Sequence, residues 1–444
     1  MKLISSIHVH RPIRTALAVI VVTAGSAGVV GGTATAGGDR HPGTISLVSV
    51  GLSGIGGNEP SGANGSSGTS AQGRYVVFAS SATDLVAGDT NGQQDIFVRD
   101  MVAGRTTLVS LGPGGMQGNG ESRLPSISAD GRFVAFDSFA SNLVPGDSND
   151  SPDVFRRDLL TGLTALASGG LNGPGDQGAV FPDISADGQH VAFESSSPNL
   201  VPGDTNQTQD IFVRNFRAGS TERVSLTSAG QQTDGPSLQP ALSGNGRVVA
   251  FTSLSGATSL QVRDRDKDTT RSVSEGITGD PRSPIHDYGA PDVSSDGRFV
   301  VFSVSSMLGT DQVANVWLRD LRTSTAQLIS ADHLGNPSTA FGGASGTVSA
   351  DGRYVTFGTT ARISPTDHGT LSDVYRLDRK TGSLVWVSHR QDQTDPWGGR
   401  LGSFAPAISD DGQHIAFDSD DKNLTGDVSP SGYEKYLWNA THPR

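Results

Sequence analysis

One short segment recurs seven times along the chain, and it limits the fold more than any other feature. The copies begin at Ser70, Ser128, Ser185, Ser243, Ser294, Ser349 and Ser409. The second copy reads "SADGRFVAFDS", and the glycines that the copies share lie between 51 and 60 residues apart. A period of this length is typical of repeat architectures, in which each unit buries its apolar surface against its neighbours.

Each repeat is expected to form four antiparallel strands. In the second unit these are "PSIS", "RFVAFDS", "DVFRRDL" and "LTALAS". Asp130-Gly131 between the first two strands is a strong hairpin signal, because glycine accepts the positive φ that the turn needs. Val134 and Phe136 should face one side of the second strand and Phe133 the other, so both sides of the sheet should be covered by neighbouring sheets.

Four-stranded sheets repeated around an axis form a β-propeller. The last unit runs out after Trp438, before its fourth strand, whereas "TISLVSVG" from Thr44 has the form of the fourth strand "TTLVSLG" from Thr106. We therefore predict an all-β, seven-bladed β-propeller of four-stranded antiparallel blades. Strand 44–50 should close the ring by pairing into the last blade, with six blades as the lesser alternative.

Composition agrees with such a fold and excludes some partners. Glycine contributes 58 residues and aromatic residues only 6%, as expected for many short strands joined by turns. There is no cysteine, so packing and strand pairing alone must hold the chain together. The formal net charge of −12 disfavours nucleic acid as a partner, because phosphate binding needs clustered Lys and Arg.

The first 36 residues differ from the rest. Lys2, Arg11 and Arg14 precede the apolar run "ALAVIVV", and Ala34-Thr35-Ala36 offers a cleavage site, which together predict a signal peptide. An uncleaved membrane anchor is the alternative, although the apolar run is short and interrupted by glycine.

We therefore divide the chain into a signal peptide (1–36), a linker (37–43), the propeller (44–439) and a tail (440–444). The mature protein is expected to be an extracellular, cell-surface or periplasmic monomer without a membrane span.

The repeated motif S-x-D-G-[RQ]-x-[VI]-x-F, followed by "DIFVRD" and a "TG" turn, resembles the WD40-like PD40 repeats of the TolB family. The resemblance covers residues 44–439, which is the propeller part of that family only. It implies a propeller fold and, as the natural function, protein binding.

A D-x-N-x-x-x-D pattern precedes the third strand in three units. Its members are Asp89, Asn91, Asp95, Asp147, Asn149, Asp153, Asp204, Asn206 and Asp210, with a degenerate form at Asp367 and Asp373. Oxygens at this spacing can converge on Ca²⁺ or another hard cation if the loop curls. Asp and Asn also cap backbone N–H groups in turns, and we favour this second interpretation. The fourth unit omits the loop and keeps both flanking strands, so a blade does not require it.

No catalytic residue can be named from the sequence. His190 and His414 occupy equivalent strand positions and are expected to pack between blades, as is Trp317, whereas Trp397 in "TDPWGGR" is the candidate for contact with a partner.

The leading hypothesis is an exported, non-enzymatic propeller that binds a protein or a cell-envelope polymer through its loop-rich face. The alternatives are a secreted hydrolase or lyase acting on a carbohydrate or lactone in the central channel, and a Ca²⁺-stabilised structural envelope protein. Carboxylates or histidines that line one channel mouth, out of register with the repeat, would favour the enzyme.

Overall fold

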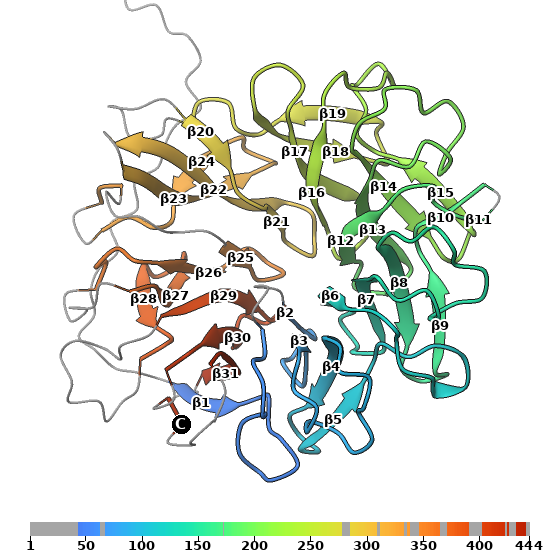
Figure 1. Cartoon of the computed structure of the whole chain (residues 1–444). Coiled ribbons are helices and arrows are strands. Elements are labelled where there is room, and N and C mark those ends of the chain that lie inside the picture. Colours follow the sequence, from blue (N-terminus) through green and yellow to red (C-terminus); the bar gives the residue numbers. More distant parts are fainter. Residues whose placement is uncertain are drawn as a thin grey trace, which may run out of the picture.

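The computed structural model of the chain is a closed ring of β-sheets around a central axis (Figure 1). It describes residues 43–62, 67–171, 173–277, 285–308, 311–332, 335–337, 346–364, 371–389, 402–421, 424–425 and 432–440. Seven blades of antiparallel strands follow one another in sequence order, as predicted, and the six-bladed alternative is wrong. The predicted signal peptide, Trp397 and Asp367 lie outside the described residues.

Blades 1 to 3 each consist of four consecutive strands, numbered from the axis outwards. Blade 1 comprises β2 (Ser67–Thr69), β3 (Tyr75–Ser80), β4 (Asp95–Asp100) and β5 (Arg105–Leu108). Blade 2 comprises β6 (Ser122–Ile127), β7 (Phe133–Ser138), β8 (Asp153–Asp158) and β9 (Leu163–Leu166). Blade 3 comprises β12 (Ala179–Ile184), β13 (His190–Ser195), β14 (Asp210–Asn215) and β15 (Ser220–Arg223). A two-stranded hairpin, β10 (Gly169–Gly170) and β11 (Gly173–Pro174), connects blades 2 and 3.

Blades 4 to 6 keep this plan, with the inner strand of blade 5 split in two. Blade 4 comprises β16 (Ser237–Leu242), β17 (Val248–Ser253), β18 (Ser259–Asp264) and β19 (Thr269–Ser272). Blade 5 comprises β20 (Ile285–Tyr288), β21 (Asp292–Val293), β22 (Phe299–Leu308), β23 (Asp311–Asp320) and β24 (Ala326–Leu328). Blade 6 comprises β25 (Gly346–Val348), β26 (Tyr354–Thr359), β27 (Asp373–Asp378) and β28 (Ser383–Trp386).

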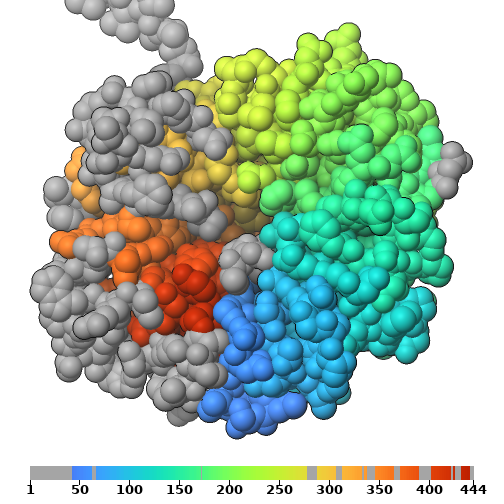
Figure 2. Space-filling model, viewed as in Figure 1, coloured from blue at the N-terminus to red at the C-terminus, as the bar shows by residue number. Residues whose placement is uncertain are grey.

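The last blade is assembled from both ends of the described chain. It comprises β29 (Ser403–Ile408), β30 (His414–Ser419), β31 (Glu434–Ala440) and, as its outer strand, β1 (Gly43–Leu47). β1 pairs with β31 from Gly43 opposite Ala440 to Leu47 opposite Tyr436. In Figure 2 the blue start of the ring accordingly lies beside the red blade. The prediction that the N-terminal strand closes the ring is confirmed.

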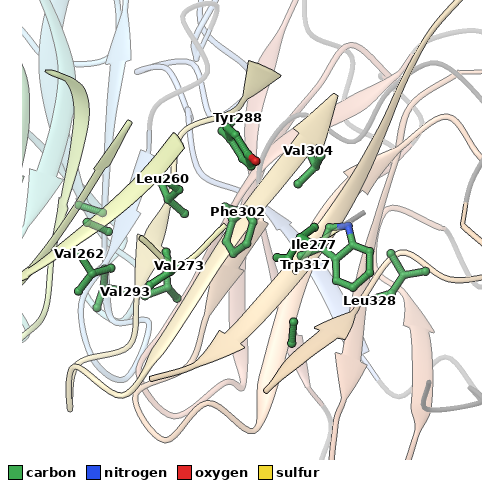
Figure 3. Packing of buried hydrophobic residues seen from close by; sticks show 14 of the residues in the cluster. Leu260, Val262, Val273, Ile277, Tyr288, Val293, Phe302, Val304, Trp317 and Leu328 are labelled. Carbon is green, nitrogen blue, oxygen red and sulfur yellow. The ribbon is translucent and has the colours of Figure 1, made fainter. Parts of the chain in front are cut away.

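The hydrophobic core is divided into layers between neighbouring blades. Seven clusters of buried residues occur, one for each pair of adjacent blades. Val134 and Phe136 pack toward blade 1 while Phe133 packs toward blade 3, which confirms the expectation that both sides of the second strand are buried. Between blades 4 and 5, Trp317 is 5% exposed and lies near Phe302 and Leu328 (Figure 3), so its predicted core position is confirmed.

The glycine of the hairpin between the first and second strands is needed for two reasons. It adopts a positive φ, and it lets a side chain of the neighbouring blade approach closely. Gly131 has a φ of 74°, which glycine adopts without steric cost. A Cβ at this position would lie 2.1 Å from the Tyr75 ring, which belongs to the second strand of blade 1. The same contact recurs around the ring. His190 and His414 make it toward Gly246 and Gly73, which is the inter-blade packing role expected for both histidines.

The strand directions separate two faces of the ring. Each inner strand runs from an inter-blade loop to the D-G hairpin, so the inter-blade loops and the loops between second and third strands share one face. We call it the loop face, and the face that carries the D-G hairpins the hairpin face. The long Gly-rich loops, including a short 3-10 turn at Pro113–Gly115, belong to the loop face. None of the described residues forms a helix long and apolar enough to cross a membrane.

Candidate functional site: the channel and the loop face

The inner strands line a channel along the ring axis. Its inner part is a cavity of about 180 Å³, and one equivalent inner-strand position of each blade borders the channel. These positions carry Gly68, Ser126, Asp183, Ala241, Asp292, Thr347 and Ala407. Two carboxyl groups, from blades 3 and 5, therefore meet the channel at the same level. They lie in register with the repeat.

Both carboxyl groups bond to the next blade along the chain. Asp183 Oδ2 accepts a hydrogen bond of 2.6 Å from the backbone N–H of Leu242. Asp292 Oδ2 accepts one of 2.8 Å from the N–H of Val348.

Hydroxyl groups make the same link elsewhere in the ring. Ser126 Oγ accepts from the N–H of Ile184, and Thr347 Oγ1 accepts from the N–H of Ile408. The polar residues at this level thus tie four of the inner strands to the following one, which gives the two aspartates a structural role.

The surroundings of Asp183 and Asp292, two of the three aspartates among the described residues that line the cavity, favour their neutral forms. Burial raises the pKa of Asp292 to about 7, and the negative charges of Asp183 and Asp410 contribute in the same direction. Burial also raises the pKa of Asp183, against its hydrogen bonds to Leu242 and Ser126. No Lys, Arg or His is among the described residues that line the cavity. A cationic group in the channel would favour ionisation of these carboxyl groups and would meet no basic side chain in the described lining.

The hairpin face of the channel is narrowed by the D-G hairpins. Backbone hydrogen bonds join neighbouring hairpins, for example from the N–H of Ala129 to the carbonyl of Ala186 at 3.0 Å. Ser295 Oγ in blade 5 also donates to Asp410 Oδ1 in blade 7 at 2.6 Å, which bypasses blade 6. The hairpin end is therefore more constricted than the loop-face end.

The loop-face mouth has an unusual backbone. Four inner strands have a bulge at which a non-glycine residue adopts a positive φ of 50–55° and is followed directly by proline. These dipeptides are Leu124-Pro125, Phe181-Pro182, Gln239-Pro240 and Ala405-Pro406. They line a depression of about 360 Å³ with Ala290-Pro291 of blade 5. Left-handed conformations of such residues cost about 1–3 kcal/mol each and concentrate at functional sites. We call this ring of dipeptides the proline rim.

In each Asp-Asn-Asp loop the asparagine side chain fastens the loop by hydrogen bonds. Asn91 Nδ2 donates to Asp95 Oδ2 at 2.7 Å and to the carbonyl of Gly118 in the inter-blade loop at 3.1 Å, while its Oδ1 accepts from the N–H of Gln93. Asn149 and Asn206 make the two corresponding Nδ2 bonds in their own blades. The asparagines therefore connect two loops of the loop face.

The last aspartate of each loop belongs to a pairing that recurs around the whole ring. A serine just after the outer strand donates to an acceptor in or at the start of the third strand and accepts from the next backbone N–H. We call this the serine clamp. The pairs are Ser110–Asp95, Ser168–Asp153, Ser225–Asp210, Ser330–Asn315, Ser388–Asp373 and Ser49–Glu434. In blade 4, Ser274 accepts from the N–H of Leu260 and pairs with Ser272. Because blades without the Asp-Asn-Asp loop also have the clamp, this aspartate has a structural role in the blade.

Burial perturbs the carboxyl groups of these loops. The pKa values of Asp95 and Asp153 rise to about 6, mainly through burial, and those of Asp89 and Asp147 are also raised by burial. No group of three or more His, Cys, Asp or Glu side chains that could hold a metal occurs among the described residues. Any cation here would therefore depend on amide or backbone oxygens in addition to two carboxylates.

The proline rim and the channel aspartates were missed by sequence reasoning. A signal was available in the inner strand, where "LPSIS", "FPDIS", "QPALS", "APDVS" and "APAIS" repeat a proline followed by the channel position.

Comparison with known proteins identifies the fold and leaves the family open. No protein-family model matches the sequence, and no curated protein matches it. Among solved structures, an oligogalacturonate lyase in complex with manganese matches over 91% of this chain and 98% of its own, with a TM-score of 0.51 and 13% identity. An oligogalacturonate lyase from Vibrio parahaemolyticus matches over 90% of this chain and 98% of its own, with a TM-score of 0.52 and 12% identity.

The chain is also similar to TolB from Acinetobacter baumannii, at 17% identity and a TM-score of 0.37. That match covers 59% of this chain and 52% of TolB, so it spans about half of the TolB chain. At these identities the matches show the propeller fold alone, because unrelated functions share it.

Proposed function

We propose that the chain is an exported, non-enzymatic β-propeller that binds a segment of a partner protein at the loop-face mouth of its channel. The observation that supports this most is the proline rim, where four strained residues surround one opening. Strain persists where the surrounding structure enforces it, and it is concentrated at ligand clamps more than on bare scaffold. Loops on a rigid scaffold are also where binding residues gather.

The chemistry of the mouth indicates what it would accept. The rim is lined by prolines together with Leu124 and Phe181, and Phe181 is 39% exposed. Below it lie the carboxyl groups of Asp183 and Asp292. A protein segment that places an apolar side chain on the rim and a Lys, Arg or amino-terminal group toward the channel would complement both. A cell-envelope polymer with cationic groups is the other ligand class.

A sugar-acid lyase is the second candidate, because two structures that match over about 90% of the chain are oligogalacturonate lyases. Two observations count against this activity. Oligogalacturonate is an anionic chain, and the described channel lining offers it aspartates and no basic residue. The described residues also contain no group of three His, Cys, Asp or Glu side chains that could hold a metal such as the manganese of that lyase complex.

The binding proposal can be tested with rim variants and a matched control. Phe181→Glu and Leu124→Glu should weaken capture of a partner from the envelope of the producing organism. Leu163→Glu, at an exposed leucine of β9 at the outer edge of blade 2, should leave capture unchanged. The captured partner is then titrated in purified form, and a tenfold or larger loss of affinity in both rim variants is expected. Equal binding by all three variants would contradict the proposal, and turnover of oligogalacturonate would support the lyase instead.

A further inference from the structure

Blade 3 holds an internal cation where its Asp-Asn-Asp loop meets the outer strand. Arg223 Nη1 lies 3.0 Å from Asp204 Oδ1 and 3.5 Å from Asp210 Oδ2. The same nitrogen donates to Gln232 Oε1 at 3.0 Å. The side chains of the arginine and the two aspartates are 9%, 4% and 0% exposed. One buried guanidinium nitrogen therefore contacts three oxygens from two loops of the chain.

Blade 1 has the three oxygens without the arginine. Asp89 and Asp95 take the places of the two aspartates in the equivalent loop. Leu108 pairs with Phe97 in the sheet register in which Arg223 pairs with Phe212, so a leucine stands where blade 3 has the cation.

The glutamine is conserved between the two blades in position and in hydrogen bonding. Gln117 Nε2 donates to the carbonyl of Gly88 at 2.7 Å, and its Oε1 accepts from the N–H of Thr90 at 3.2 Å. In blade 3, Gln232 makes the same two bonds, at 2.8 and 3.2 Å, while its Oε1 also accepts from the arginine. The blade 1 oxygen is therefore placed like the one that contacts the guanidinium.

One of these oxygens lacks a partner in blade 1. Asp89 is 8% exposed, and its Oδ1 has no hydrogen-bond partner among the described residues, although the N–H of Asn91 bonds the same carboxyl group. This is the atom that corresponds to Asp204 Oδ1, which contacts Arg223. Leaving a buried carboxylate oxygen unsatisfied is unfavourable.

We propose that Asp89 Oδ1, Asp95 Oδ2 and Gln117 Oε1 of blade 1 bind a Ca²⁺ ion at the place that the Arg223 guanidinium occupies in blade 3. All three ligands are oxygens, which suits a hard cation, and Ca²⁺ tolerates irregular geometry better than Mg²⁺. Water supplies the remaining ligands from the exposed side at Thr90. With three protein ligands the affinity should be in the range of about 10⁻⁵ to 10⁻³ M.

The equivalent loop of blade 2 lacks one of the three oxygen ligands, so it is a weaker candidate for Ca²⁺ binding. Asn149 bonds the carbonyl of Gly175 as Asn91 bonds that of Gly118, so the residue before each glycine is equivalent. That residue is Pro174 in blade 2, which offers no side-chain oxygen. Among the three Asp-Asn-Asp loops that the structure describes, the one in blade 1 is therefore predicted to bind Ca²⁺.

The test exchanges the outer-strand residue, Leu108 or Arg223, between the two blades. Chelator-treated full-length protein is titrated with CaCl₂ by calorimetry, and its melting temperature is followed with and without Ca²⁺. Wild type should bind one equivalent and melt at a higher temperature with Ca²⁺. Leu108→Arg, which installs the blade 3 arrangement, should lose both effects. Arg223→Leu should gain a second equivalent, made by Asp204, Asp210 and Gln232.

A further variant keeps the proposal falsifiable if the arginine does not fit in blade 1. Asp89→Asn removes the unsatisfied charge and should weaken Ca²⁺ binding at least tenfold without unfolding the chain. Wild type that shows neither heat nor a shifted melting temperature at millimolar Ca²⁺ would overturn the proposal. Unchanged Ca²⁺ binding by Asp89→Asn would overturn it as well.

Discussion

Ser49 Oγ donates a hydrogen bond of 2.5 Å to Glu434 Oε2, although the two residues are separated by 385 positions in the sequence. The same hydroxyl accepts from the N–H of Lys435 at 2.9 Å. Glu434 and Ser49 are 1% and 0% exposed. The serine clamp of the closing blade is thus formed by a residue just after β1 and the first residue of β31, and it is the copy that joins the two ends of the ring.

Replacing this serine should weaken the ring more than replacing the clamp serine of blade 4, which has no carboxylate partner. Ser49→Ala removes a donor from a buried carboxylate and an acceptor from a buried N–H, so we expect a loss of about 1–3 kcal/mol in the free energy of unfolding. Ser274→Ala in blade 4, where the clamp has no carboxylate, is the matched control and should cost less. Denaturant unfolding monitored by circular dichroism measures both, and equal losses would contradict the special role of the closing clamp.

The hairpin glycines should be intolerant of alanine for two separable reasons. Gly131→Ala introduces a Cβ that would lie 2.1 Å from the Tyr75 ring and also enforces a positive φ on alanine. We expect a loss of about 2–4 kcal/mol. Gly146→Ala is the control, because Gly146 has a φ of 83° and open space around its Cβ position. It should lose only about 1 kcal/mol, from the dihedral term. Similar losses in thermal unfolding would mean that the blade contact adds nothing.

Relief of strain at the proline rim should stabilise the fold relative to a substitution that retains it. Leu124 has a φ of 50°, a conformation that glycine accepts and alanine does not. Leu124→Gly should therefore be about 1 kcal/mol more stable than Leu124→Ala, although both lose the same apolar side chain. Chemical denaturation of the two variants is the measurement. If the alanine variant is the more stable, the strain is absent in solution.

The channel carboxyl groups should make the protein less stable at pH 8 than at pH 5. Asp292 has a raised pKa of about 7 in the folded state, so between its unfolded pKa near 4 and pH 7 the folded chain holds a proton that the unfolded chain has released. The contribution of this proton to the free energy of unfolding is fully present below pH 4 and is lost as the pH rises through 7. The loss should be on the order of 1–2 kcal/mol, because the carboxyl group borders the channel.

Asp292→Asn removes this titration while keeping an oxygen for the Val348 N–H. The fall in melting temperature between pH 5 and pH 8 should become shallower in this variant than in wild type. Asp100→Asn serves as the control, because its carboxyl pairs with Arg74 and has a lowered pKa of about 2, outside this pH range. An unchanged slope in Asp292→Asn would mean that other buried carboxyl groups carry the pH dependence.

The repeat was sufficient to predict most of the fold. The D-G hairpins, the alternation around Val134 and the incomplete last unit each correspond to a local rule, and each rule describes the structure correctly. Each rule concerns contacts within one blade or between equivalent strands, and these contacts have the same geometry in every copy of the repeat.

The candidate sites depend on contacts between blades, and this is why they were harder to predict. Asp183 and Asp292 occupy an ordinary strand position, and only ring closure brings them to one channel. Asp89 and Asp204 belong to the same motif and are distinguished by a single outer-strand residue, Leu108 or Arg223, whose distance from the loop follows from the fold.

The pairing of β1 with β31 also has a consequence for the order of events during folding. Among the described strands β1 pairs with β31 alone, so the edge "GTISL" stays open until Glu434–Ala440 has emerged and reached it. Contacts so distant in sequence form slowly, and an unpaired apolar strand is open to pairing with other chains in the meantime. The chain is therefore most prone to pairing with other chains before β31 has formed. A factor that covers β1 during this time would reduce that risk.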